Sequence, residues 1–299
     1  MAVFIDTPLW PAHGTVFAHL VSDTSLAELH AFAAAAGVPE RAFDEDHYDV
    51  PERRHAELVA RGARPVDAGT LVRVLLASGL RVPARERSKS LVVPLRDRWD
   101  TVLPGRPELG AELVERWGEP HRRYHTRAHL MAVLTALEQI AGQAPRAVVL
   151  AAWFHDAVYR VPTAGGRGGP PGQDEEDSAQ LAEARLSEAG LGSAEAAEVG
   201  RLVRLTAAHA PGAHDGDGQL LSDADLSVLG REARGYHRYT AQVRDEYRHV
   251  PDDAYREGRS AVLGRLLALD PLFHTEAARG LWLARAHENL AAELARLGH

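Results

Sequence analysis

Short apolar runs and amphipathic stretches alternate along the first 80 residues. The runs at 2–5 and 16–21 are bounded by proline, glycine or aspartate, and they predict two buried strands. Capping residues and terminal glycines predict four further elements: a helix from the caps at 22–24 to Ala36, a helix from Pro51 to Gly62, a strand at 64–66 and a helix near 68–78. Strands that alternate with helices indicate a small α/β domain over residues 1–80.

The pattern changes after residue 80. Residues 81–90, RVPARERSKS, are charged, contain a proline and lack periodicity, so we interpret 81–94 as a linker. Beyond it, apolar residues recur at helical spacing in these segments: 95–103, 108–117, 126–141, 145–158, 175–189, 194–209, 223–230, 233–247, 253–268 and 275–296. The predicted fold class is therefore α+β multidomain, with a small α/β domain followed by an all-α domain at 95–299.

One segment interrupts the helical half. Residues 163–173, TAGGRGGPPGQ, hold too much glycine and proline for a regular element and predict a surface loop. Because the loop follows His155 and Asp156, it could act as a lid. A neutral insertion at the surface is the alternative that stays open.

Composition narrows the chemistry and the location. The chain has 299 residues and 45% hydrophobic content, enough for two domains with a core each. It has no cysteine, which excludes disulfides, thiolate zinc sites and a cysteine nucleophile, so His, Asp or Glu must bind any metal. The N-terminus does not resemble a signal peptide, and no apolar run reaches the roughly 20 residues of a membrane span. We therefore expect a cytoplasmic protein with no membrane partner.

Charge bears on the partner. The net charge of −8 argues against nucleic acid, whose phosphate backbone selects basic surfaces. Nearly all positive charge is arginine, with Lys89 as the one lysine. A local arginine group could bind a small phosphorylated molecule, although codon usage also explains an arginine excess.

Two imidazoles and two carboxylates stand out in the helical half. His129, in HRRYHTRAH, follows His125 by four residues on a predicted helix, and the apolar helix at 147–159 carries His155 and Asp156 side by side. A buried aspartate needs a partner, and either a metal or a hydrogen-bonded histidine can supply it.

The fourth residue is Asp225, at the start of the predicted helix 223–230. N-capping can explain either Asp223 or Asp225, but not both. Two histidines and two aspartates that converge would form a mixed nitrogen and oxygen site for a divalent transition metal. Such a site would suit metal-assisted hydrolysis.

These motifs resemble a known family. A histidine, an adjacent His-Asp pair and a distant aspartate are the signature of the HD-domain superfamily of metal-dependent phosphohydrolases, and the resemblance covers about residues 95–299. The blocks that carry it are RRYHTRAH, WFHDAVY, DEEDSA at 174–179, TAAH at 206–209, DADLSVLG and HENLAAEL. The resemblance implies an all-α HD-type domain in which His129, His155, Asp156 and Asp225 bind manganese, cobalt, nickel, iron or magnesium. The family usually has asparagine where this chain has Thr126 and Asp174.

Further residues are candidates for roles in catalysis and substrate binding. Glu176, or else Glu175, could act with Asp156 to orient water or accept its proton, while capping of a helix N-terminus is the alternative for both glutamates. The candidates for substrate binding are Arg123, His125, His209 and Arg244. For the two histidines, binding of a second metal ion and a structural role also stay open.

The first 80 residues also hold polar side chains of reactive types. His19 lies in a predicted strand, and His47, Tyr48 and Asp49 precede a helix. The segment resembles a small bacterial domain family of uncharacterised function, so a structural role and a small ligand or metal site both stay open. His30 lies on an apolar helix face and is predicted to join the core.

The predicted function is that of a metal-dependent phosphohydrolase acting on a phosphate ester of a small molecule, with a nucleotide as the favoured class. The first alternative is a non-catalytic or regulatory metal-containing module that binds a phosphorylated ligand. The second is an interaction protein whose N-terminal domain recruits a partner.

Overall fold

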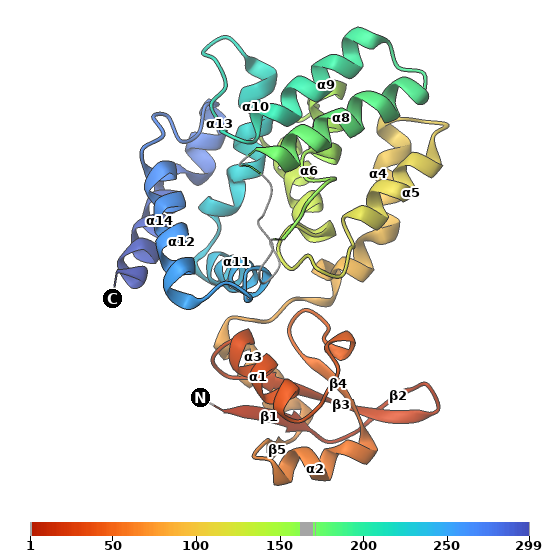
Figure 1. Cartoon of the computed structure of the whole chain (residues 1–299), viewed down its shortest axis with the longest axis vertical. Helices are drawn as coiled ribbons and strands as arrows, with labels where there is room; N and C mark the ends of the chain where they lie inside the picture. The colour runs from red at the N-terminus through yellow and green to blue at the C-terminus, as the bar shows by residue number, and fades with distance from the viewer. Residues whose placement is uncertain (1, 162–169, 171, 299) are drawn as a thin grey trace. The chain divides into compact units, whose positions relative to one another are not determined.

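The chain folds into two compact units (Figure 1). The structure is a computed structural model that describes residues 2–161, 170 and 172–298. Unit 1 combines residues 1–84 with 237–248, and unit 2 combines 85–236 with 249–299. The first boundary falls within the predicted linker. Residues 237–248, however, were predicted to belong to the helical domain, because a helical pattern does not reveal which core the apolar face joins.

Unit 1 is built on a mixed five-stranded sheet. Its strands are β1 (Val3–Asp6), β2 (Trp10–Ala12), β3 (Thr15–Ser22), β4 (Tyr48–Pro51) and β5 (Arg64–Val66). β3 pairs antiparallel with β1, β2 and β4, whereas β1 and β5 are parallel. The sequence pattern missed β2 and β4, since β2 is short, exposed and contains Pro11, and β4 is only four residues long.

Three helices accompany this sheet: α1 (Leu26–Ala35), α2 (His55–Ala60) and α3 (Ala68–Ser78). Ser25 caps α1 by accepting the N–H of Glu28, and Asp67 caps α3 by accepting that of Thr70. The 3₁₀ turns in residues 2–91 are η1 (Glu40–Ala42), η2 (Glu52–Arg54), η3 (Ala84–Glu86) and η4 (Ser88–Leu91). The last two lie within the predicted linker.

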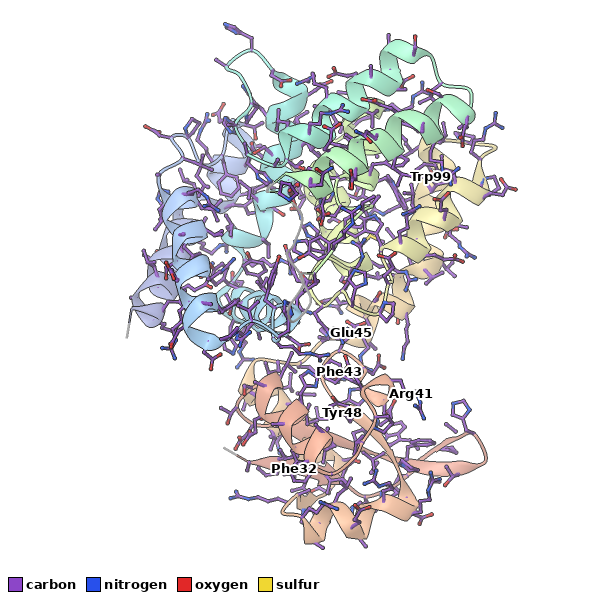
Figure 2. The ribbon with its side chains drawn as sticks, in the orientation of Figure 1. Phe32, Arg41, Phe43, Glu45, Tyr48 and Trp99 are labelled. Atoms are coloured by element: carbon purple, nitrogen blue, oxygen red, sulfur yellow. The ribbon has the colours of Figure 1, made fainter. Side chains whose placement is uncertain are left out.

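Successive residues of β1 and β3 point to opposite faces of the sheet and join two separate cores. One core contains Ile5, Leu20, Leu29, Val50 and Leu58. The other contains Val21, Leu71, Leu75 and Leu80, with Ala241 of the segment 237–248 against them. Tyr48 of β4 belongs to the first core, and Phe43 packs against this core. The ring centroids of the two residues are 5.1 Å apart (Figure 2).

All regular elements in the described residues of unit 2 are helical. Its helices are α4 (Val92–Val102), α5 (Pro107–Arg116), α6 (Arg127–Ala141), α7 (Arg146–Phe154), α8 (Gln173–Glu188), α9 (Ser193–Leu205), α10 (Gly216–Asp225), α12 (Asp252–Leu267), α13 (Glu276–Ala278) and α14 (Ala284–Leu297). Helix α11 (Ala233–Glu246) contributes to both units. The 3₁₀ helix η5 (Leu226–Gly230) and the π-helix η6 (Arg279–Leu283) complete the set. The coarse prediction of an α/β part followed by a mostly helical part is confirmed.

Buried tryptophans form the core beneath α6 and α7. Trp99, Trp117 and Trp153 are fully buried, and the Trp117 indole N–H donates to the carbonyl of Trp153 at 2.9 Å. This hydrogen bond satisfies a polar group that would be costly to bury alone.

Most of the loop predicted at 163–173 lies outside the described residues, so its interpretation as a lid stays a prediction. Helix α8 begins at Gln173. In the part of the chain that the structure describes, no helix has both the length and the apolar character required to cross a bilayer.

Candidate metal centre

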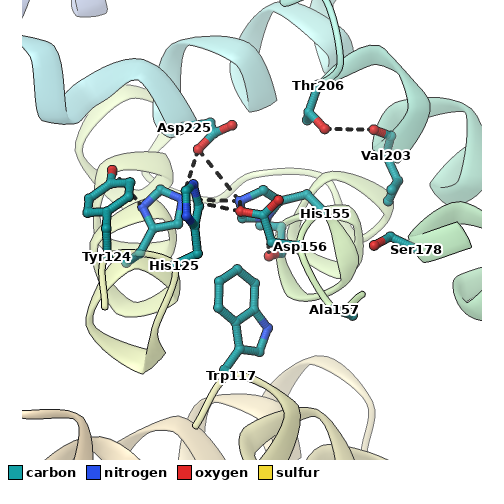
Figure 3. Close-up of polar contacts among 12 residues, drawn as sticks. Trp117, Tyr124, His125, His155, Asp156, Ala157, Ser178, Val203, Thr206 and Asp225 are labelled. Atoms are coloured by element: carbon teal, nitrogen blue, oxygen red, sulfur yellow. Dashed lines mark hydrogen bonds and ion pairs between the residues drawn. The ribbon is translucent and has the colours of Figure 1, made fainter. Parts of the chain in front are cut away.

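Three helix ends of unit 2 bring the predicted ligands together (Figure 3). His129 lies in the first turn of α6, whose N-cap Thr126 accepts the N–H of Ala128. His155 is the C-cap of α7, and Asp156 follows it in a turn. Asp225 is the last residue of α10.

Two of these placements differ from the prediction. Asp225 ends a helix instead of starting one, because Asp215 caps α10 ten residues earlier and two glycines obscure the helical pattern there. His125 precedes the N-cap of α6, so it does not share a helix face with His129. Its ring still lies 5.7 Å from that of His129 between centroids, because the chain turns at Thr126.

The ligand-type atoms converge closely. The Nε2 atom of His129 lies 3.2 Å from Nε2 of His155 and 3.0 Å from Oδ1 of Asp225. Nε2 of His155 lies 3.3 Å from Oδ2 of Asp156 and 3.5 Å from Oδ1 of Asp225. One ligand atom from each of His129, His155 and Asp156 lies within 4.8 Å of the other two, so these three residues could hold a metal ion.

Hydrogen bonds fix the orientation of both imidazoles. Nδ1 of His155 lies 2.8 Å from the carbonyl of Ala152, which can only accept, so the Nδ1–H donates and Nε2 faces the cluster. Nδ1 of His129 lies 3.1 Å from the hydroxyl of Tyr124. Metal-binding histidines commonly have the second ring nitrogen occupied in this way.

The spacing fits a single ion. Two ligands bound at right angles with bonds of about 2.1 Å lie about 3.0 Å apart, and opposite ligands about 4.2 Å apart. The contacts of His129 with Asp225, at 3.0 Å, and with Asp156, at 3.9 Å, fall within that range. A mixed set of two imidazoles and two carboxylates suits a divalent transition metal.

The electrostatics of the cluster also favour a cation. Burial acts to lower the pKa of His155, but the charges of Asp156 and Asp225 outweigh it and hold that pKa well above 6.5. Burial acts to raise the pKa of Asp225, yet His155 and the hydrogen bonds from the neighbouring imidazoles lower it well below 3.8. The carboxylates therefore stay ionised in a buried site and attract positive charge.

Tyr124, Trp117 and Arg122 support the cluster, and the sequence analysis did not assign them roles. The Trp117 ring lies 5.2 Å from that of His155, between centroids. The buried Arg122 guanidinium donates to the carbonyls of His125 and Asp156, at 3.1 and 2.8 Å, and so ties the two ligand-bearing segments together. In the sequence these residues lie in the segment WGEPHRRY, where no spacing singles them out as supports of the cluster.

His209 contacts a ligand instead of pointing to open solvent. Its Nε2–H donates to Oδ2 of Asp225 at 2.8 Å, which leaves Oδ1 to face the other ligands. The backbone of His209 is left-handed, at φ 50°, a conformation that non-glycine residues adopt at a cost and that concentrates at functional sites.

The two glutamates of α8 differ in their surroundings. Both carboxylate oxygens of Glu176 accept from Arg204, at 2.7 and 2.9 Å, and these bonds lower its pKa to about 2. Burial raises the pKa of Glu175, and the nearby charge of Asp156 raises it further. Glu175 therefore lies close enough to Asp156 to feel its charge, whereas Glu176 is paired with Arg204.

The remaining candidates are placed as follows. The His125 ring stacks on Tyr159 at 4.2 Å between centroids, and its charge acts on Asp156. The Arg123 guanidinium donates to the carbonyls of Pro120 and Arg122 in its own turn. Arg244 lies in residues 237–248 of unit 1 and donates to the carbonyl of Tyr247 at 2.7 Å.

Asp223 has a separate structural role. Its two oxygens accept the backbone N–H groups of His274 and Thr275, each at 2.7 Å. The two aspartates of SDADLSVLG, which the sequence could not distinguish, therefore have different roles. Asp223 accepts from backbone amides before α13, and Asp225 faces the histidines.

One family model matches the chain. It describes a protein of unknown function, DUF4031, and it matches residues 3–78, within unit 1. No curated protein and no solved structure matches. The N-terminal segment is thus similar to a family without an assigned activity, and the resemblance of residues 95–299 to the HD superfamily stays a prediction.

Proposed function

We propose that unit 2 is a metal-dependent phosphohydrolase of the HD type. The observation that carries this proposal is the convergence of His129, His155, Asp156 and Asp225, with both imidazole Nε2 atoms turned toward the carboxylates. Within the helical half these residues come from three separate helix ends: the start of α6, the end of α7 and the end of α10. The proposed metal is manganese, cobalt, nickel, iron or magnesium, since the ligand types do not choose among them.

The chemistry follows from the donor set. A divalent ion in this site would lower the pKa of water toward neutrality and offset the negative charge on a phosphoryl oxygen. We assign to Glu175, which is half-buried and feels the charge of Asp156, the role of accepting the proton that an attacking water would lose. Burial raises its pKa toward neutral pH, which suits that role. His209 holds Asp225 in position through the 2.8 Å hydrogen bond.

The proposed substrate is a phosphate ester of a small molecule, with a nucleotide as the favoured class. The net charge of −8 disfavours a polyanionic substrate, whereas a single phosphate needs only local positive charge. His125, stacked on Tyr159 next to the cluster, is the side chain we assign to contact that phosphate.

Turnover tests this proposal. Protein loaded with Mn²⁺, Co²⁺ or Ni²⁺ should hydrolyse at least one ester in a panel of nucleoside monophosphates, cyclic nucleotides and aryl phosphates. Asp156→Ala should reduce kcat/KM by more than the roughly 10–100-fold cost of losing a group that only orients a ligand. The control is Asp100→Ala, an exposed aspartate on α4, which should leave the rate unchanged.

Two results would contradict the proposal. One is hydrolysis that survives in Asp156→Ala. The other is a metal-loaded protein that binds nucleotides without hydrolysing any ester in the panel, which would favour the non-catalytic module.

A further inference from the structure

A second group of ligand-type side chains lies in unit 1. His19, on β3, and Asp49, on β4, are directly opposite each other in the antiparallel ladder. His47 directly precedes β4, and its ring centroid lies 4.9 Å from that of His19. The pairing of β3 with β4 and this ring contact bring the three side chains together.

The distances within this group are short. Oδ1 of Asp49 lies 3.3 Å from Nε2 of His47 and 3.8 Å from Nε2 of His19. One ligand atom from each residue lies within 4.8 Å of the other two. Ligands of one ion with bonds of about 2.1 Å lie between about 3.0 and 4.2 Å apart, and both measured contacts fall in that range.

Buried carboxylates orient both histidines. Nδ1 of His19 lies 3.0 Å from Asp6, and Nδ1 of His47 lies 2.6 Å from Asp46. A carboxylate can only accept, so each Nδ1–H donates and each Nε2 turns toward Asp49. Asp6 and Asp46 are 1% and 0% exposed, which makes them fixed supports and not solvated charges.

These supports are themselves anchored. Asp6 also accepts the backbone N–H of His19 at 2.6 Å, because β1 lies beside β3. Asp46 also accepts the N–H of Val82 at 2.7 Å and contacts Arg81. A carboxylate behind each imidazole is the arrangement that raises the basicity of metal-binding histidines.

Solvent can reach the group from one side. The Asp49 side chain is 42% exposed and that of His19 is 23% exposed, whereas His47 is buried. Asp6 ends β1, which runs parallel to β5, and ligands in open α/β sheets commonly bind at the carboxyl ends of such strands.

We propose that His19, His47 and Asp49 form a second metal site, which binds a divalent transition ion and leaves positions open for water or a substrate oxygen. Two imidazoles and one carboxylate are the ligands of many zinc and non-haem iron(II) sites that keep open positions. The site lies within the residues that match the family of unknown function, so it gives unit 1 a chemical role independent of the helical cluster.

The test uses the full chain with the helical cluster disabled by His155→Ala and Asp156→Ala. This parent protein, freed of metal with chelator, is titrated with Co²⁺ and followed by visible absorption. It should bind about one equivalent, and Asp49→Ala or His47→Ala should weaken binding by at least about tenfold. His13→Ala, which removes an exposed histidine of the same unit, is the control and should bind as the parent does.

Asp49→Ala also keeps the test valid if the buried His47 variant fails to fold, since Asp49 is the most exposed of the three ligands. Circular dichroism checks that each variant retains its fold. A parent that binds no Co²⁺, or a folded Asp49→Ala variant that binds as tightly as the parent, would overturn the proposal and leave the two histidines as hydrogen-bonded structural residues.

Discussion

Asp225 shows how one side chain links the parts of the helical cluster. Its Oδ1 faces His129 and His155, while its Oδ2 accepts from His209. The sequence suggested that Asp225 had a role beyond capping, but the contact with His209 depends on a left-handed turn that no spacing rule predicts.

Glu175 and Glu176 are adjacent in the sequence, yet they should behave differently in catalysis. We predict that Glu175→Gln lowers kcat by about 100-fold or more, because a positioned general base typically contributes 10²–10⁴-fold. Glu176→Gln should change kcat only a few-fold, since Glu176 is held by Arg204. Steady-state kinetics on the substrate found in the panel measures both. Equal losses of kcat in the two variants would show that Glu175 is not the general base.

Neighbouring residues on a helix differ by about 100° in direction, so the sequence could not separate these two glutamates. It placed both at the start of a helix. What distinguishes them is Arg204 on α9, which forms an ion pair with Glu176. Arg204 is distant in the sequence and reaches Glu176 only because α8 and α9 pack together.

At the scale of the elements, the position of the cluster depends on helix ends. α10 carries Asp225 at its last residue and begins at the cap Asp215, which accepts the N–H of Gly218 at 3.0 Å. Arg201 of α9 donates to both oxygens of Asp215, at 2.7 and 2.9 Å. This cap therefore fixes the helix that delivers a ligand.

We predict that Asp215→Ala destabilises unit 2 by about 1–2 kcal/mol, the usual cost of an N-cap, with little added for the half-exposed arginine pair. Hydrogen bonds from Arg201 lower the pKa of Asp215 below 3.8 in the folded protein. The stabilisation is complete above that pH and is lost as the pH falls through the folded pKa. Urea unfolding from pH 7 to pH 3 should therefore show the gap between wild type and Asp215→Ala narrowing in acid.

Tryptophan fluorescence is a suitable probe, because Trp99, Trp117, Trp153 and Trp282 all lie in unit 2. A gap that is constant across the pH range would mean that the Asp215 carboxylate does not stabilise α10.

The apolar pattern predicted the existence of most helices, but it was least reliable at their ends. The predicted helix 145–158 ends at Phe154. The predicted helix 223–230 begins with the last three residues of α10 and continues as the 3₁₀ turn η5. In both places the proposed metal ligands lie where the α-helix ends: His155 and Asp156 after α7, and Asp225 at the end of α10. Helix ends depend on caps and tertiary hydrogen bonds, which periodicity does not record.

At the scale of the whole molecule, composition and pattern indicated two parts with different secondary structure. They did not indicate that residues 237–248 return to unit 1, where Ala241 joins the core of Leu71 and Leu75 and Asp245 pairs with His30 at 3.0 Å. Such long-range pairing comes from complementary surfaces, and a single sequence does not reveal it. The same limit applies to the two candidate metal sites, one in each unit. The sequence suggested which residues could belong to each site, but only the fold shows that they lie close together.

The central claim is that the helical cluster binds a divalent metal. The most direct test is elemental analysis of the full chain, loaded with Mn²⁺ or Ni²⁺ and desalted, compared with the His155→Ala, Asp156→Ala double variant. Any metal held in unit 1 cancels in the difference. We predict a loss of about one equivalent per chain in a variant that retains its circular dichroism spectrum, since four ligands of one ion share this site. Equal metal content in the two proteins would contradict the account.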